Sequence, residues 1–308
     1  MGPVKIALVG LGKIARDQHV PVLAQNRSFE LIAAASPHAR FDGVRSYPDL
    51  DTLLNDIPDV DAVAVCTPPQ VRYAIARRAL EHGCHVLLEK PPAVTLSEVN
   101  ALIGLASERG LTLFATWHSR EAAGVEPARQ WLTKRHVRTV KVEWKEDVRV
   151  WHPGQGWIWK AGGLGVFDPG INALSILTRI LSGTLLMRDA ELAFPANCET
   201  PIAARLKLAT QQGTEISMEL DFLHAGEPQW DMGVETEDGQ LQLSKGGALL
   251  RVNGQTTVCA SDVEYSNLYE HFARLIAERR IDVDLAPFTL VADAFLCGRR
   301  VGVPPFVE

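Results

Sequence analysis

Two residues that could do chemistry, Asp168 and Asn172, lie four positions apart in the stretch GGLGVFDPGIN, residues 162–172. Aspartate is a favoured helix N-cap, and Pro169 suits the first helical position. The following residues, NALSILTRIL, continue with the apolar spacing of a helix. These residue types alone therefore favour Asp168 as a cap. The alternative is catalytic, because a carboxylate can accept a proton and an amide four residues later shares its helix face.

A third candidate, Lys90, follows an apolar run in HVLLEKPP. A lysine at the carboxyl end of a parallel strand lies at the edge of the sheet where such folds bind ligands. The proline after it disfavours helical geometry at Lys90 and so restricts its direction. The alternative is a solvated surface lysine.

A glycine turn, VGLGKIA, contains Gly10, Gly12 and Ala15 in the pattern GxGxxA. It follows an apolar strand and opens a helix, which is the context that dinucleotide binding requires. Gly10 allows a tight turn, Gly12 lets the backbone approach a pyrophosphate, and Ala15 permits close helix–strand packing. The helix N-terminus would face the phosphate charge. The alternative is a plain turn between a strand and a helix.

The end of the second predicted strand indicates which nucleotide binds. NAD-preferring sites usually place Asp or Glu there to bind the ribose 2′-hydroxyl, but this strand ends in Ser36. Serine does not repel a 2′-phosphate, and His38 or Arg40 could bind one. We therefore predict NADP as cofactor, with NAD also accepted. The alternative is that these three are ordinary loop residues.

The tryptophans of the chain indicate the class of substrate. Indole can cover the C–H face of a sugar ring while its N–H binds a hydroxyl. The segment WHPGQGWIWK, residues 151–160, holds three tryptophans just before the Asp168 motif. We predict that Trp151 and Trp230, the latter in a later turn, bind substrate. His118, beside the end of the fifth predicted strand, is a further candidate. The alternatives are core or interface tryptophans and a structural histidine.

These side chains need elements to position them, and the N-terminal third alternates between strands and helices. The predicted strands are KIALVG, ELIAAAS, VDAVAVC, CHVLLEK and TLFATWH. Helical segments such as RYAIARRALEHG and LSEVNALIGLASERG lie between them. Buried apolar strands separated by helices predict a parallel sheet covered on both faces.

After about residue 120 the pattern changes to an alternation of period two. It covers TVKVEWKEDVRVW, AARLKLATQQGTEISMELDF and DMGVETEDGQLQLSKGGALLRVNGQTTV, with turn signals between the runs. This pattern predicts a mainly antiparallel open sheet with the helix after Pro169 packed on it. The fold class is therefore α/β, with domains at 1–120 and 121–308 and a boundary near residues 118–122.

Composition limits the classes of partner. The chain has 308 residues, 46% of them hydrophobic and 22% charged, and a net charge of −6. This is typical of a globular protein of two domains. No run of Lys or Arg suggests nucleic acid or an anionic membrane. Because the first residues run straight into a predicted strand, we expect no signal peptide, and the sequence contains no apolar run near 18 residues. The five cysteines lack metal-ligand spacing, so we expect reduced thiols, mostly core filling, in a cytoplasmic protein without a metal.

Three segments, GLGKIARDQHVPVL, CTPP and EKPP, occur in the order and spacing of the Gfo/Idh/MocA (glucose–fructose oxidoreductase / inositol dehydrogenase) family. GG followed by DPGIN resembles that family's second-domain motif, and the resemblance covers essentially the whole chain. It implies a Rossmann domain followed by an open-faced α/β domain that usually forms homo-oligomers, dimers or tetramers, through its sheet. The length, WHSR and DPGIN most resemble bacterial aldose 1-dehydrogenases, which oxidise L-arabinose or D-galactose to the lactone.

The resemblance also implies roles for individual residues. Lys90 would reach toward the nicotinamide and the reacting hydroxyl. Asp168 would face the substrate from the interdomain cleft, where the family usually has a histidine four residues later and this chain has Asn172. An amide cannot take a proton, so we predict Asp168 as proton acceptor and Asn172 as an orienting residue. Further implied cofactor-binding residues are Lys13, Ile14, Thr67, Pro68 and Glu89.

Another departure is Arg72, where many relatives carry histidine, and no role is predicted for it. Two other functions remain open. One is a dehydrogenase of the same fold acting on an inositol, a diol, an imine or another sugar. The other is a non-catalytic dinucleotide sensor, since a fold does not fix a function. A sensor would not need Lys90 or Asp168, and both are present.

Overall fold

The computed structural model describes residues 2–260 and 263–308, and the chain divides into two compact units. The first unit comprises Met1–Trp117 and Tyr265–Asp284, and the second comprises His118–Glu264 and Leu285–Glu308. The predicted division at residue 120 differs from this one because residues 265–284, assigned above to the second domain, return to the first unit.

In the first unit, the described strands form a six-stranded parallel sheet of order β3-β2-β1-β4-β5-β6. The strands are β1 (Val4–Val9), β2 (Phe29–Ala35), β3 (Arg45–Tyr47), β4 (Ala62–Val65), β5 (His85–Leu88) and β6 (Leu113–Ala115). The helices are η1 (Ala15–His19), α1 (Val20–Gln25), α2 (Leu50–Asp56), α3 (Pro69–His82), α4 (Leu96–Arg109) and α8 (Glu264–Glu278). The predicted parallel sheet is confirmed; the short strand β3 was not predicted.

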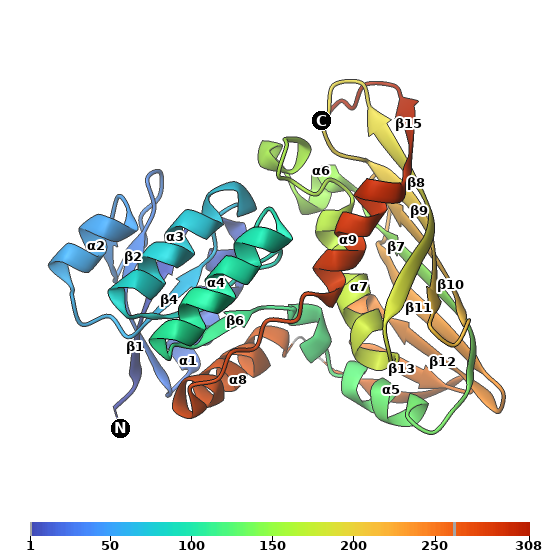
Figure 1. Cartoon of the computed structure of the whole chain (residues 1–308), viewed down its shortest axis with the longest axis horizontal. Coiled ribbons are helices and arrows are strands. Elements are labelled where there is room, and N and C mark those ends of the chain that lie inside the picture. The colour runs from blue at the N-terminus through green and yellow to red at the C-terminus, as the bar shows by residue number, and fades with distance from the viewer. Residues whose placement is uncertain (1, 261–262) are drawn as a thin grey trace. The chain divides into compact units, whose positions relative to one another are not determined.

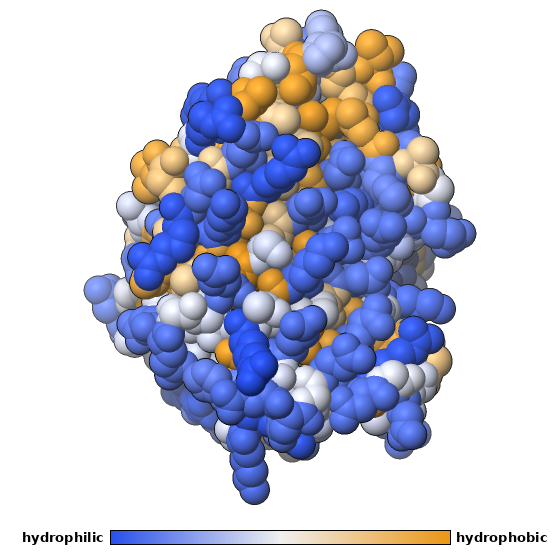
Figure 2. Space-filling model, turned by 90° about the vertical axis from the view of Figure 1, so that its right-hand side faces the viewer, coloured by the Kyte–Doolittle hydropathy of each residue, from blue (hydrophilic) through white to orange (hydrophobic). Residues whose placement is uncertain are grey.

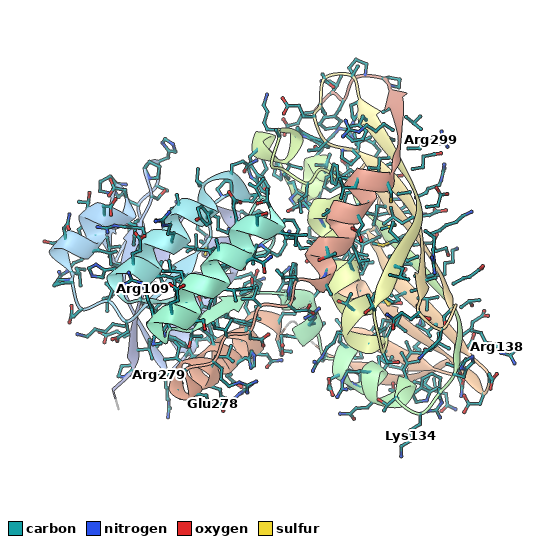
Figure 3. The ribbon with its side chains drawn as sticks, viewed as in Figure 1. Arg109, Lys134, Arg138, Glu278, Arg279 and Arg299 are labelled. Carbon is teal, nitrogen blue, oxygen red and sulfur yellow. The ribbon has the colours of Figure 1, made fainter. Side chains whose placement is uncertain are left out.

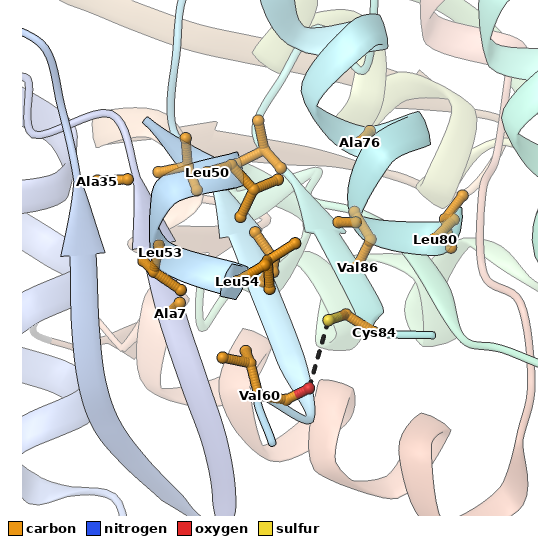
Figure 4. Packing of buried hydrophobic residues seen from close by; sticks show 14 of the residues in the cluster. Ala7, Ala35, Leu50, Leu53, Leu54, Val60, Ala76, Leu80, Cys84 and Val86 are labelled. Atoms are coloured by element: carbon orange, nitrogen blue, oxygen red, sulfur yellow. Dashed lines mark hydrogen bonds between the residues drawn. The ribbon is translucent and has the colours of Figure 1, made fainter. Parts of the chain in front are cut away.

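Both faces of the sheet are buried at its centre, because strands such as β1 and β4 carry apolar residues on both sides. In β1, Ala7 and Val9 face one core, and Ile6 and Leu8 face the other. The first core is closed by leucines of α2 together with residues of α3 and α4. Figure 4 shows Leu50, Leu53 and Leu54 packed over the sheet, and the Cys84 thiol donates to the Val60 carbonyl at 3.3 Å.

The second core is covered by residues 265–284, which belong to the first unit although they follow the second sheet in the sequence. Helix α8 buries a stripe of large side chains against the sheet: Tyr265, Leu268, Tyr269, Phe272 and Leu275. The segment after it continues alongside β6, since Asp282 exchanges backbone hydrogen bonds with Leu113 and Ala115. Figure 1 shows α8, from late in the chain, beside α1 and β6, from its beginning.

Charged residues end these helices at the exterior of the first unit. Figure 3 labels Arg109 at the end of α4 and Glu278 at the end of α8. The Arg109 guanidinium donates to the carbonyl of Glu81 at 2.9 Å. A cation in the last turn complements the partial negative charge of a helix C-terminus.

In the second unit, the described strands form a nine-stranded mixed sheet of order β14-β13-β12-β11-β7-β10-β9-β8-β15. The strands are β7 (Val137–Lys145), β8 (Leu185–Pro195), β9 (Ala203–Thr210), β10 (Glu215–Asp221), β11 (Gln229–Thr236), β12 (Gly239–Ser244), β13 (Leu249–Val252), β14 (Gln255–Cys259) and β15 (Arg299–Val303). The helices are η2 (His118–Glu121), α5 (Val125–Leu132), α6 (Val148–Trp151), η3 (Gly156–Trp159), α7 (Phe167–Ile180), η4 (Lys245–Gly247) and α9 (Ala286–Cys297).

Most neighbouring strands of this sheet are antiparallel, as predicted, but β10 pairs with β7 and β15 with β8 in parallel. Two details of the prediction are wrong. The alternating run that was read as one strand ends at Lys145, and α6 follows because Asp147 caps it by accepting from the Arg149 N–H at 3.0 Å. Trp230, placed above in a turn, is the second residue of strand β11.

The sheet of the second unit has one face covered by helices and one face open. In β7, Val140, Val142 and Trp144 are buried on the helix side, where α7 lies against the strand. On the open side Lys145 pairs with Glu143 at 3.1 Å. Figure 1 shows α5, α7 and α9 on the same side of the sheet. Figure 2 shows mainly hydrophilic side chains over the open side, with apolar ones gathered toward the end where β15 lies.

The cysteines are all free thiols. Only Cys66 and Cys84 are buried, whereas Cys259 and Cys297 are exposed and Cys198 is half-buried. The expectation that most of them fill the core is therefore wrong, because three lie at strand or helix ends and in a loop. In the part of the chain that the structure describes, no helix has the length and apolarity needed to cross a membrane.

Candidate functional site

The glycine turn lies where the strand order of the first unit reverses, between β1 and β4. Gly10 has a φ of +94°, and a Cβ there would lie 2.8 Å from the backbone nitrogen of Thr67. Only glycine fits this left-handed, crowded position. Gly12 differs, because a Cβ there would meet nothing within 4 Å. The turn therefore brings the backbone close to the β4 loop at Gly10 and leaves open space beside Gly12.

This geometry fits a dinucleotide. Open doubly wound sheets bind ligands at the point where the strand order reverses. The hydroxyl of Thr67 is buried and has no hydrogen-bond partner among the described residues, so it could bind a ligand there. Pro68 is the N-cap residue of α3, and Ile14 packs against the core beneath the turn. Lys13 forms an ion pair with Asp17.

The loop after β2 carries the residues expected to select the nucleotide. Ser36 follows the last residue of β2, is buried, and donates its backbone N–H to Tyr47 at 2.9 Å. The Arg40 guanidinium folds back over this loop and donates to the carbonyl of Ser36 at 2.8 Å and of Ala39 at 3.0 Å. His38 is exposed. A cation therefore stands beside the position where NAD sites usually carry a carboxylate.

Lys90 lies two residues beyond β5, as the sequence indicates, and the Lys90–Pro91 peptide bond is cis. The carboxylate of the preceding Glu89 is buried. Its Oε1 lies 3.0 Å from His19 Nε2 and accepts from the Tyr265 hydroxyl at 2.9 Å. Its Oε2 accepts from the backbone N–H of Lys90 at 3.1 Å. Glu89, predicted to bind cofactor, is thus the centre of a buried network under the Lys90 loop.

His19 is fully buried in the same network, with Nδ1 2.7 Å from the Tyr269 hydroxyl. Burial by itself would lower the pKa of His19, but the acidic groups Cys66, Tyr269 and Glu89 around it raise that pKa well above its usual range. Burial raises the pKa of Tyr269 to about 12. The imidazole is therefore stabilised as a cation against the Glu89 carboxylate.

In the second unit, helix α7 presents Asp168 and Asn172 one turn apart. The helix begins at Phe167 with Val166 as N-cap and no side-chain cap bond, so the interpretation of Asp168 as a cap is wrong. Backbone turns precede the helix, with the Asp168 N–H donating to the Gly165 carbonyl at 2.8 Å, and they shift the cap upstream. Asp168 is 3% exposed. The side-chain oxygen of Asn172 is buried and has no partner among the described residues.

Close packing holds this helix in place. A Cβ at Gly170 would lie 2.6 Å from a methyl group of Leu220 in β10, so glycine lets α7 sit directly on the sheet. The Arg120 guanidinium donates to the Ser175 carbonyl at 2.9 Å further along the helix. Both contacts fix the direction of the first turn, which carries Asp168.

Two residues that the sequence analysis missed complete this cluster. His152, just after α6, has Nδ1 3.7 Å from Asp168 Oδ2 and Nε2 3.0 Å from Glu146 Oε1. Glu146, directly after β7, is 3% exposed. An imidazole between two buried carboxylates can hold or pass a proton. The sequence did contain one indication of Glu146. Asp147 is a favoured helix-cap residue, so the alternating run could have been ended before it, which places Glu146 at the end of a strand.

The two tryptophans chosen from the sequence lie together beside this cluster. The rings of Trp151 and Trp230 are edge to face with centroids 4.8 Å apart. Trp230 Nε1 donates to Glu146 Oε2 at 2.8 Å. Trp151 is 39% exposed, which leaves part of its ring available to a ligand. Apolar ring faces thus border buried carboxylate and imidazole groups, which is the lining that sugar binding needs.

His118 begins η2, and its Nδ1 lies 2.5 Å from Glu264 Oε2. This ion pair fits the structural alternative for His118 as well as a role in binding. The structure therefore brings Asp168, Asn172, Trp151 and Trp230 into one unit, and it places Lys90 with the dinucleotide motif in the other.

Known proteins resemble this chain in both sequence and structure. Residues 4–116 match a family model described as the oxidoreductase family (GFO_IDH_MocA) with an NAD-binding Rossmann fold. A galactose 1-dehydrogenase of Pseudomonas fluorescens is 42% identical, and the similarity covers 100% of both chains.

Solved structures extend the similarity to the whole fold. The crystal structure of a D-galactose-1-dehydrogenase from Rhizobium etli is 49% identical, with a TM-score of 0.95 over 100% of this chain and 99% of that chain. The 3-ketoreductase KijD10 from Actinomadura kijaniata, in complex with NADP and TDP-benzene, is 20% identical, with a TM-score of 0.87 over 98% of this chain and 100% of that chain. This second similarity shows the fold alone.

Proposed function

The chain belongs to the Gfo/Idh/MocA family of oxidoreductases, and on this premise we propose that it is an NADP-dependent aldose 1-dehydrogenase. It oxidises the C1 hydroxyl of D-galactose and L-arabinose to the lactone. The observation that carries the proposal is the buried polar cluster of the second unit, bordered by the indoles of Trp151 and Trp230. The similarity of the whole chain to galactose 1-dehydrogenases supports the choice of substrate class.

The residues of the second unit divide the work on the sugar. Asp168 accepts the proton of the anomeric hydroxyl, because it is a buried carboxylate and Asn172 cannot act as a base. Asn172 orients the sugar by accepting a hydroxyl hydrogen bond at its buried oxygen. His152, next to Asp168 and held by Glu146, stabilises the charge of the carboxylate or receives the proton from it.

The first unit supplies the other part of the reaction. When bound, the nicotinamide supplies the hydride acceptor for C1. The glycine turn and the helix that follows it bind the phosphates. Lys90 carries an ammonium group that stabilises negative charge developing on the reacting oxygen. Its loop is held rigidly by Glu89.

The test of substrate class is a screen of aldoses with the purified protein and NADP, following reduced nicotinamide by its absorbance. L-Arabinose and D-galactose share the configuration of their ring hydroxyls and differ at C5, where galactose carries a hydroxymethyl group. We expect both to be oxidised, with L-arabinose favoured. D-Glucose inverts the 4-hydroxyl, and an unmatched buried polar group costs about 1–3 kcal/mol, or roughly 5–150-fold in efficiency. Equal efficiency on D-glucose would refute the proposal, and dinucleotide binding without any turnover would favour a sensor.

The cofactor preference is a separate prediction. Because Ser36 replaces the usual acidic residue and Arg40 lies over the same loop, we expect a lower KM for NADP than for NAD. Ser36→Asp should reverse this order, since its carboxylate repels a 2′-phosphate and accepts a bond from a 2′-hydroxyl. Steady-state kinetics with both cofactors measure the preference. A KM of the wild-type protein for NAD that equals or is lower than its KM for NADP would contradict the prediction.

We also propose a homo-oligomer formed through the open face of the sheet. Apolar side chains gather on that face toward the end where β15 lies, and an exposed apolar patch is typical of an interaction surface. Light scattering of the purified protein tests the assembly, and a monomer at all concentrations would contradict it.

A further inference from the structure

Arg72 is a buried arginine to which the sequence analysis gave no role. It lies in the first turn of α3 and is only 3% exposed. Its neighbours on the same helix, Arg77 and Arg78, are exposed and form ion pairs with Glu81 and Asp51. A buried guanidinium is retained in a fold only when strong acceptors satisfy it.

Backbone carbonyls of two loops accept hydrogen bonds from Arg72. Nη1 donates to the carbonyl of Glu89 at 2.5 Å and to that of Pro91, the two residues that flank Lys90. Nη2 donates to the carbonyl of Thr67 in the loop after β4. One planar group therefore joins the loop that carries Lys90 to the loop whose Thr67 backbone packs against the glycine turn.

Helix stability does not explain a cation at this position. The N-terminus of a helix carries partial positive charge, so a cation in the first turn is unfavourable and an anion is favourable. The first turn of α3 contains no acidic residue. The benefit of Arg72 must therefore come from the loops that it binds.

The Lys90 loop is also held from its other side. The backbone N–H of Lys90 donates to Glu89 Oε2, while His19 and Tyr265 hold Glu89 Oε1. The N–H of Lys90 and the two carbonyls around it are thus all bonded to buried side chains. This arrangement fixes the main chain of residues 89–91 and determines where the side chain of Lys90 begins.

We propose that Arg72 is a positioning residue that fixes the main chain at Lys90 for hydride transfer, an inference that rests on the proposed dehydrogenase function. The guanidinium has five donors in a rigid plane and can bind three carbonyls at once. Lysine at this position would keep the charge but would lose the planar geometry. A displacement of about 1 Å at a reacting group can cost roughly 100-fold in rate.

The test compares Arg72→Lys with Arg78→Lys, a matched substitution at an exposed position of the same helix. We expect Arg72→Lys to lower kcat for D-galactose about 10-fold or more, with KM for the sugar little changed. The kinetic isotope effect on kcat with C1-deuterated galactose should increase, because the misplaced step becomes slower than product release. Arg78→Lys should match the wild type in kcat, in KM for the sugar and in the isotope effect. If Arg72→Lys does not fold, Arg72→Gln replaces it, with the same expectation.

A second readout does not depend on activity. Hydrogen exchange of the Lys90 amide, followed by mass spectrometry of the full-length protein, should be faster in Arg72→Lys than in the wild type and unchanged in Arg78→Lys. A lower melting temperature with wild-type kcat and isotope effect would overturn the inference, and so would a lower kcat with unchanged exchange. If the wild type oxidises no aldose, the proposed function fails, and the exchange measurement alone then decides whether Arg72 fixes this loop.

Discussion

At the scale of the single residue, Asp168 lies in the first turn of α7 and is not its N-cap residue. Val166 is the N-cap residue of α7, and no side-chain cap bond is made there. Oδ2 of Asp168 lies 3.7 Å from Nδ1 of His152, which is too long for a direct hydrogen bond. A capping residue affects helix stability, whereas a proton acceptor affects turnover. Substitution of Asp168, with both quantities measured, therefore separates the two roles.

We expect Asp168→Asn to fold, to bind NADP normally and to lower turnover by about 100-fold or more, the scale of general-base catalysis. Asn172→Ala should be milder, because it removes an orienting hydrogen bond and leaves the base. Turnover, melting temperature and cofactor affinity, measured together for both variants, check this. An active Asp168→Asn enzyme would mean that the proton leaves through Lys90, His152 or water.

The buried His19 predicts a pH dependence of stability. Its pKa in the folded protein is raised well above the usual value, so the folded state holds the proton more tightly than the unfolded chain. The stabilisation is complete below the unfolded pKa of about 6.5 and is lost as the pH rises through the folded pKa. We expect His19→Gln to flatten the decline of melting temperature above neutral pH. His82→Gln, at an exposed position, is the control and should keep the wild-type slope.

At the scale of the element, the loops after β1, β4 and β5 show how strand ends are used. All three lie at the carboxyl edge of the parallel sheet of the first unit, where backbone and side chains can converge. Gly10 contacts the Thr67 backbone, and Arg72 joins Thr67 to the residues around Lys90. Gly12 has no such contact. The two glycines therefore have different physical roles, although they belong to one motif.

This difference can be measured with a matched pair of substitutions. Gly10→Ala should lower the free energy of unfolding by about 1–2 kcal/mol or more, because it forces a left-handed residue against backbone. Gly12→Ala should change that free energy by less than about 0.5 kcal/mol. It should instead raise KM for NADP roughly 10-fold, the equivalent of one lost hydrogen bond. Thermal unfolding measures the stability of the two variants, and cofactor titration measures their binding of NADP. Equal losses of stability in the two variants would contradict the different roles given to Gly10 and Gly12.

At the scale of the whole molecule, the chain crosses between its two units more than once. After building the sheet of the second unit it returns to the first, where α8 covers one face of the parallel sheet. The dinucleotide-binding unit is therefore incomplete without residues 265–284. Tyr265 links this return to function, since its hydroxyl binds the Glu89 carboxylate beneath Lys90.

A fragment of residues 1–120 should therefore fail to fold on its own. It lacks Leu268, Phe272 and Leu275, each worth about 1.5–3 kcal/mol when buried, which together approach the roughly 5–15 kcal/mol of a whole domain. Joining residues 2–117 to residues 265–284 through a flexible linker should restore cooperative unfolding and NADP binding. Circular dichroism and cofactor titration compare the two fragments. Cooperative unfolding of the shorter fragment would contradict this view of the unit.

The sequence by itself determined features that depend on near neighbours. Apolar runs and their periods predicted the parallel sheet and the largely antiparallel sheet, and the glycine turn and the strand-end lysine were found where the structure has them. These features follow from local backbone geometry and from which face of an element is buried. Only the tertiary structure decided the neighbours of His152, the carbonyls that Arg72 binds and the return of α8. Such contacts join residues that are far apart in the chain, or residues at bends where a periodic pattern ends. Their geometry depends on how helices and strands pack against one another after they have formed.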